Sequence, residues 1–166
     1  MLGKVNKKSN KESLIQSTVK FIWHKGTKFQ HLRPITQVYG VCFDRSGRIL
    51  IIREPNKLWN IPGGKPEIHE TVIQALKREL REEADVTISD KQMIGYFEVV
   101  SGHSTIYQLR YACLIETIRD QSLDPTSNAT NERKFVKQKD FFDFVNIADY
   151  KPMIEEAIKW FKRRQS

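Results

Sequence analysis

The chain has 166 residues, a mass of 19.5 kDa and a formal net charge of +8. At roughly 150 residues per domain, this length predicts one domain with about thirty residues left for an extension. A hydrophobic content of 39% excludes a disordered chain. The longest aliphatic run, Ile49–Ile52, excludes a membrane span, which needs roughly 20 apolar residues. The positive charge favours polyanionic partners such as nucleotides, polyphosphates or RNA.

The first segment, 1–33, is predicted to be a basic N-terminal extension. Residues 1–12 are polar and rich in lysine, with no apolar stretch typical of a secretory signal, so we expect a cytoplasmic protein. Apolar residues alternate over 19–23, which predicts a strand, and Phe29 and Leu32 suggest a second strand that returns. The extension could add a strand pair, cover a sheet edge or form a homodimer contact, and these alternatives stay open.

A hairpin opens the main domain, which we expect to span 34–166. Residues 36–43 are rich in β-branched and aromatic side chains, 48–53 are similarly apolar, and the turn residues 44–47 lie between them. The next stretch, 54–70, contains three prolines and two glycines. A loop of this length is typically functional.

A helix is predicted over 71–84, because its apolar side chains fall on one arc of the helix surface. The remaining predicted elements are strands over 94–100, 106–117 and 134–136, an apolar turn over 141–145, and a helix over 149–164 with Asp149 as its N-cap. Hairpins combined with two separated helices predict an α/β layered domain around a mixed sheet. Cys42 and Cys113 each lie in an apolar strand, so we expect two buried free thiols.

Three carboxylates gather on the helix over 71–84. Glu79, Glu82 and Glu83 are spaced i, i+3, i+4, so they share one quarter of the helix circumference, where like charges repel. Glu83 also falls within the apolar stripe, where a carboxylate loses part of its hydration. Clustered carboxylate oxygens suit a hard divalent cation such as Mg²⁺. The alternative, from these residues alone, is a solvated, salt-bridged helix face.

A glycine loop precedes this helix and completes a longer motif. Gly63–Gly64 allows the backbone to approach a ligand closely, and Pro62 stiffens the loop. In the spacing G-x5-E-x7-R-E-U-x-E-E-x-G-U, where U is aliphatic, the chain places Gly64, Glu70, Arg78-Glu79-Leu80, Glu82-Glu83 and Val86. This pattern resembles the signature of the Nudix hydrolases, and the run 59–63 resembles the sequence that commonly leads into it. Weaker resemblance covers roughly 36–145.

One motif position departs from the family. Asp85 stands where the family has its last glycine, at the end of the helix. Asp tolerates the left-handed conformation better than most other residues with a side chain. We therefore expect a slightly strained helix end and an active enzyme.

The resemblance implies an α/β/α sandwich around a mixed sheet, here with an N-terminal β extension. It also implies hydrolysis of a nucleoside diphosphate linked to another moiety, with Mg²⁺ as cofactor and Mn²⁺ as a substitute. The metal would neutralise the charge that builds on the leaving phosphate and acidify the attacking water. By motif position, the metal ligands are Glu79, Glu82, Glu83 and the backbone of Gly64, with Gly63 as an alternative carbonyl ligand. Arg78 would orient the catalytic carboxylates, with Glu70 as its ion-pair partner.

The general base and the substrate contacts are less tightly specified. In this family the base lies within the motif, which favours Glu82 or Glu83, or on a later loop, where Glu132 precedes a short strand. The predicted substrate-binding residues are Gly63, Gly64, Trp59 and His103.

Two other functions stay open. The basic charge also fits an RNA 5′-pyrophosphohydrolase, a substrate class less favoured than a small nucleotide. A Nudix-fold module that binds a nucleotide or RNA without catalysis would usually lack some motif carboxylates, and this chain keeps them all.

Overall fold

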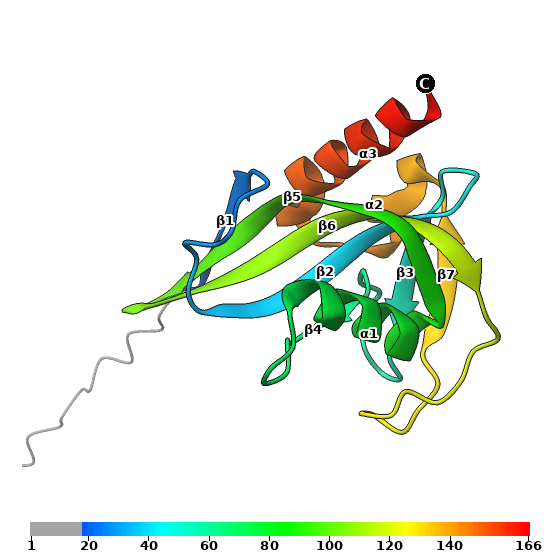
Figure 1. The fold of residues 1–166 in the computed structure, drawn as a ribbon, viewed down its shortest axis with the longest axis horizontal. Helices are drawn as coiled ribbons and strands as arrows, with labels where there is room; N and C mark the ends of the chain where they lie inside the picture. The colour runs from blue at the N-terminus through cyan, green and yellow to red at the C-terminus, as the bar shows by residue number, and fades with distance from the viewer. Residues whose placement is uncertain (1–17) are drawn as a thin grey trace, which may run out of the picture.

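The computed structural model describes residues 18–166 as a seven-stranded mixed sheet with helices on both sides (Figure 1). The predicted α/β/α sandwich is confirmed, whereas the basic arm expected over 1–12 lies outside the described residues. The strands are β1 (Lys20–Lys25), β2 (Ile35–Phe43), β3 (Ile49–Arg53), β4 (Gly63–Gly64), β5 (Val86–Ser101), β6 (Ser104–Ile118) and β7 (Glu132–Val136). The helices are α1 (Val72–Ala84), α2 (Phe141–Phe144) and α3 (Lys151–Gln165), with 3₁₀ turns at Gln138–Asp140 and Ala148–Tyr150.

The sheet has the strand order β1-β5-β6-β2-β3-β7, and β4 pairs with β2 outside this path. β2 runs parallel to β6, and the other strand pairs are antiparallel. The long β5–β6 hairpin forms the middle of the sheet, and the predicted N-terminal strand joins its edge as β1, antiparallel to β5.

Side chains that alternate along the strands divide the core into two layers, because successive residues of a strand point to opposite faces. In β3, Ile49 and Ile51 join the layer beneath α3, while Leu50 and Ile52 join the layer beneath α1. The two helices therefore cover opposite faces of one sheet (Figure 1).

The helix that carries the motif has well-defined ends. Thr71 caps α1 through a reciprocal capping box, in which the Thr71 side chain accepts from the Gln74 amide and the Gln74 side chain accepts from the Thr71 amide. Asp85 ends the helix in the left-handed conformation, with φ 51° and ψ 43°. This is the strained helix end expected from the sequence.

Several predicted elements differ from the structure. The strand expected over 94–100 begins already at Val86, because pairing with β6 carries the polar first half of β5 into the sheet. The return strand expected at Phe29 and Leu32 is wrong: both side chains pack into the core layer beneath α1 from irregular backbone.

Near the C-terminus, Asp149 lies in a 3₁₀ turn and is not the N-cap of α3, which begins at Lys151 with Tyr150 at the cap position. Pro152 in the first turn fits this start, since proline lacks the amide that the first turn leaves unpaired. The apolar turn expected over 141–145 is the short helix α2.

Both cysteines are free and buried, as expected. Within residues 18–166, no helix has both the length and the apolar character that crossing a membrane requires.

Candidate active site

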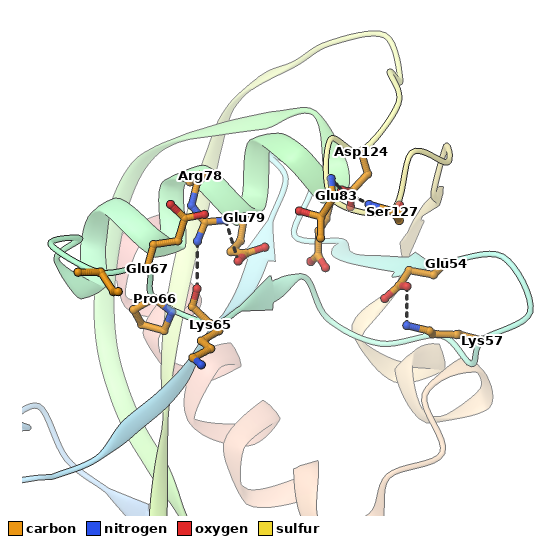
Figure 2. A pocket seen from close by; sticks show the side chains of 12 residues that line it. Glu54, Lys57, Lys65, Pro66, Glu67, Arg78, Glu79, Glu83, Asp124 and Ser127 are labelled. Carbon is orange, nitrogen blue, oxygen red and sulfur yellow. Dashed lines mark hydrogen bonds and ion pairs between the residues drawn. The ribbon is translucent and has the colours of Figure 1, made fainter.

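A cleft of about 790 Å³ opens beside the exposed side of α1 (Figure 2). Four segments meet there: the β3–β4 loop, the glycine loop, α1, and the loop between β6 and β7. The lining residues are Glu54, Lys57, Lys65, Pro66, Glu67, Ile68, Arg78, Glu79, Glu83, Asp124, Thr126 and Ser127. Tertiary folding thus brings motif residues together with groups that lie far from them in sequence.

The two motif glycines serve the site in different ways. The Gly63 amide donates a hydrogen bond of 2.7 Å to Glu83 Oε2. A Cβ on Gly63, whose φ is 152°, would lie 2.3 Å from the Val38 carbonyl oxygen, so backbone packing requires glycine there. A Cβ on Gly64 would instead lie 2.4 Å from Glu79 Oε1. Because Gly64 has no side chain, the Glu79 carboxylate can occupy the space next to it.

Arg78 organises the remaining carboxylates. Its Nε and Nη2 donate to the two oxygens of Glu70 at 2.9 and 3.0 Å, which is the ion pair expected from the motif. Its Nη1 donates to Glu79 Oε1 at 2.9 Å and to Glu82 Oε2 at 3.1 Å, and its Nη2 also donates to the Lys65 carbonyl at 3.0 Å. The Arg78 hydrogen bonds lower the pKa of Glu70, and the Glu70 hydrogen bonds raise the pKa of Arg78. One guanidinium therefore orients three motif carboxylates and fixes the glycine loop to α1.

The cleft disfavours the charged form of its buried carboxylates. The pKa of Glu83 is raised to about 8. Burial is the largest cause, the hydrogen bond from the Gly63 amide opposes it, and the charges of Glu79, Asp124 and Glu54 add to the rise. Burial also raises the pKa of Glu79, although Arg78 opposes this shift. Within residues 18–166, Glu83 has no cationic side chain as an ion-pair partner.

Carboxylate and carbonyl oxygens are the ligands that Mg²⁺ and Mn²⁺ prefer, so the donor chemistry of the cleft fits such an ion. The side chains are not gathered around one point: in the part of the chain that the structure describes, no three His, Cys, Asp or Glu residues form a ready-made ligand group. Arg78 holds Glu79 and Glu82, while the Gly63 amide holds Glu83. Joint coordination by all three would require their side chains to turn.

Glu132 does not reach the cleft. It opens β7, with 60% of its side chain exposed, and Arg53 Nη2 donates to it at 2.8 Å. The family resemblance made Glu132 a candidate base on a later loop because it precedes a short strand. In the structure, that strand pairs with β3 and holds Glu132 opposite Arg53.

Trp59 and His103 lie outside the cleft lining as well. The Trp59 ring packs edge-on against Phe144, and the guanidinium of Arg53 and the ammonium of Lys134 lie 4.7 and 5.2 Å from the ring centre. His103 is in the turn that joins β5 to β6. A strand of 16 residues, roughly 50 Å at about 3.3 Å per residue, separates this turn from the end of α1, so the turn does not approach the motif.

The sequence reasoning missed Asp124, which lines the cleft with only 6% of its surface exposed. Its Oδ1 accepts hydrogen bonds from the amides of Thr126 at 2.7 Å and Ser127 at 3.2 Å. An Asp whose oxygen accepts from the amide two residues later is typical of an Asx turn, and the run Asp-Pro-Thr-Ser is a recognisable signal for one. That signal predicts the turn but not its place beside Glu83. The sequence also did not identify Glu54, Lys57 and Lys65 as site residues, because no local pattern shows that they line the cleft.

The family model described as the NUDIX domain matches residues 33–162. The phosphatase NudJ of Escherichia coli is 25% identical over 122 residues, which cover 72% of this chain and 78% of NudJ.

Two solved structures share the fold. A MutT structure, from a study of the Aliivibrio salmonicida and Vibrio cholerae proteins, aligns with a TM-score of 0.58 and 24% identity over 76% of this chain and 98% of that one. The Bacillus subtilis pyrophosphohydrolase BsRppH aligns with a TM-score of 0.55 and 21% identity over 72% of each chain.

Proposed function

Because this chain belongs to the Nudix hydrolase family, whose members act on pyrophosphate bonds, we propose that it is a metal-dependent pyrophosphohydrolase. Its substrate is a nucleoside diphosphate linked to another moiety, either a nucleoside triphosphate or a nucleotide derivative. Water attacks at phosphorus, and the pyrophosphate link breaks.

One observation carries the proposal: Glu79 and Glu83 reach into the same cleft as Asp124, and no cationic side chain within residues 18–166 neutralises Glu83 (Figure 2). A divalent cation held by Glu79, Glu82, Glu83 and the Gly64 carbonyl would supply the missing charge. When bound, it would polarise the phosphate oxygens and offset the charge that develops on the leaving group.

The chain's own cations complement the substrate. Lys65, beside the glycine loop, and Lys57, in the β3–β4 loop, both line the cleft where an anionic pyrophosphate would lie (Figure 2). Lys65 makes no ion pair within residues 18–166, so its ammonium is available to a phosphate, whereas Lys57 pairs with Glu54. Arg78 faces the carboxylates and serves to orient them, with Glu70 fixing its other edge.

A substrate panel with and without Mg²⁺ tests the proposal, with phosphate or nucleoside monophosphate release as the readout. The variant Glu83→Gln should lose more than about 100-fold of the Mg²⁺-dependent rate, since even groups behind metal ligands cost about 10–100-fold. Circular dichroism confirms that the variant folds. Glu155→Gln, an exposed glutamate of α3, is the matched control and should keep full activity. Near-full turnover by Glu83→Gln would discard the metal assignment.

The identity of the general base is tested separately. Glu82 and Glu83 stay candidates from the motif, and Asp124 joins them because it lines the cleft. Glu132 is less favoured because it pairs with Arg53 and is exposed. The variants Asp124→Asn and Glu132→Gln are compared by pH–rate profile: removal of the base abolishes the limb of the profile that the base controls. A changed profile in Glu132→Gln alone would restore Glu132.

RNA is the second candidate substrate, favoured by the net charge of +8. Binding through several phosphates weakens steeply between about 50 and 200 mM salt. A KM that barely changes over this range excludes RNA. We also propose a cytoplasmic location, which the buried free thiols Cys42 and Cys113 support because such thiols persist in reducing compartments. A homodimer stays a prediction, tested by light scattering.

A further inference from the structure

Asp85, the residue that replaces the family's motif glycine, does more than end α1. Its amide hydrogen-bonds to the carbonyls of Arg81 and Leu80, as a left-handed helix cap does. Its carboxylate leaves the helix and accepts two hydrogen bonds from Ser122, one from the amide to Oδ2 and one from the hydroxyl to Oδ1, each 2.8 Å long. Both carboxylate oxygens of Asp85 therefore accept hydrogen bonds from Ser122, which lies 37 positions later in the chain.

The same helix end binds both ends of the loop over 119–131. At its start, the Arg119 amide donates to the Asp85 carbonyl at 2.9 Å. At its finish, Asn131 Nδ2 donates to the Glu83 carbonyl at 3.2 Å. Just beyond the loop, Arg133 Nη1 donates to the Ala84 carbonyl at 2.7 Å. The carbonyls that a helix leaves unpaired at its last turn thus anchor this loop.

Ser122 is held by the side chain of Asp85, the residue that caps the end of α1, and it lies two residues before Asp124. Asp124 is almost fully buried and lines the cleft beside Glu83 (Figure 2). A glycine at position 85 would adopt the same backbone conformation without a carboxylate to hold Ser122. Compared with the family's glycine, Asp85 therefore strains the helix end but adds two hydrogen bonds to the loop.

We propose that Asp85 is a positioning residue, whose carboxylate and Ser122 form a latch that holds the 119–131 loop with Asp124 turned into the cleft. The proposal rests on the proposed function, in that this cleft is where the reaction takes place. Asp85 itself touches neither substrate nor metal and acts through Asp124.

Hydrogen exchange tests the latch without any activity. In Asp85→Gly, the Ser122 amide and its loop neighbours should exchange about tenfold faster or more, as expected when a hydrogen bond to a charged acceptor is lost. Asp120→Asn is the matched control, because it removes the same charge from an exposed side chain that makes no hydrogen bond or ion pair within residues 18–166. Unchanged exchange in Asp85→Gly overturns the latch.

Kinetics test what the latch does. Asp85→Gly should lower kcat about tenfold while KM stays within about twofold. Its melting temperature should stay close to that of the wild type, because relief of the left-handed strain offsets the loss of the two hydrogen bonds to Ser122. Ser122→Ala should show a smaller loss of the same kind, and adding it to Asp85→Gly should cause no further loss. Asp85→Asn, which keeps one acceptor and tolerates the same conformation, should recover part of kcat.

A purely structural role predicts a different pattern, in which Asp85→Gly keeps the wild-type kcat. That result contradicts the proposal. If the wild type hydrolyses none of the panel substrates, the proposed function fails, and exchange alone then decides the latch.

Discussion

α1 and α3 cover opposite faces of one sheet but bury different kinds of side chain (Figure 1). α1 buries Ala75, Leu76, Leu80 and Ala84, whereas α3 buries Met153, Ile154, Ala157, Trp160 and Phe161. Beneath α1 lies Gly40 of β2, where a Cβ would be 3.3 Å from Leu76 and 3.4 Å from Leu80. Small residues therefore allow α1 to approach the sheet closely, while large aromatic residues fill the space under α3.

Stability and function depend on different faces of this domain. On the side that borders the cleft, α1 carries the carboxylates that Arg78 and the glycine loop hold in place. Its interactions at the site are polar, partly exposed and individually modest. Under α3, burial of large apolar surface supplies stability that the site does not need to provide. Substitutions on the two sides should therefore affect different measurements.

The largest expected effect lies under α3. Trp160 is completely buried, so Trp160→Ala should lower the free energy of unfolding by about 3–5 kcal/mol, as large-to-small aromatic substitutions in cores do. Urea denaturation measures the loss. The folded fraction should keep the wild-type kcat. A folded variant with strongly reduced kcat would break the division between the two faces.

The two motif glycines separate stability from activity within the site. In Gly64→Ala, the new Cβ displaces the flexible Glu79 carboxylate, so kcat should fall about 100-fold, the cost of a misplacement of about 1 Å, with little change in stability. In Gly63→Ala, the new Cβ meets the rigid backbone at Val38, so the fold itself should lose stability. Thermal melting and kcat of both variants test this, and equal behaviour of the two would contradict it.

Arg78→Lys tests whether Arg78 positions the carboxylates of α1. A lysine has no planar fork, so it cannot hold Glu70, Glu79 and Glu82 at once, and kcat should fall at least about tenfold. Arg81→Lys is the matched control, since Arg81 is exposed on the same helix and makes no side-chain hydrogen bond within residues 18–166. Equal kcat values for the two variants would remove the positioning role of Arg78.

The smallest effect is expected at an ion pair of α3. Hydrogen bonds from Lys25 and Lys159 hold the pKa of Glu156 below its ordinary value. A lowered native pKa stabilises the fold above the unfolded pKa of about 4.3 and loses that contribution as the pH falls through the native pKa. Glu156→Gln should therefore cost about 0.5–1 kcal/mol at neutral pH and nothing in acid, by urea denaturation at a series of pH values. An equal cost at every pH would exclude the ion pair as its source.

Much of the fold could be predicted from sequence wherever a local pattern was strong. The apolar stripe of α1 predicted its bounds within one residue, and the first hairpin was placed as closely. The first half of β5 and the irregular path of Phe29 were misjudged. In both segments, strand pairing or core packing with residues distant in the sequence outweighs the local conformational preference of the chain.

The sequence by itself determined the part of the site that lies within one helix and the loop before it. Spacing of i, i+3 and i+4 places Glu79, Glu82 and Glu83 on one helix face wherever the rest of the chain goes. It could not place Asp124 in the cleft, remove Glu132 from it, or join Asp85 to Ser122. Those positions depend on how the β6–β7 loop packs against the end of α1, and contacts between residues far apart in the chain are decided only when the sheet has formed.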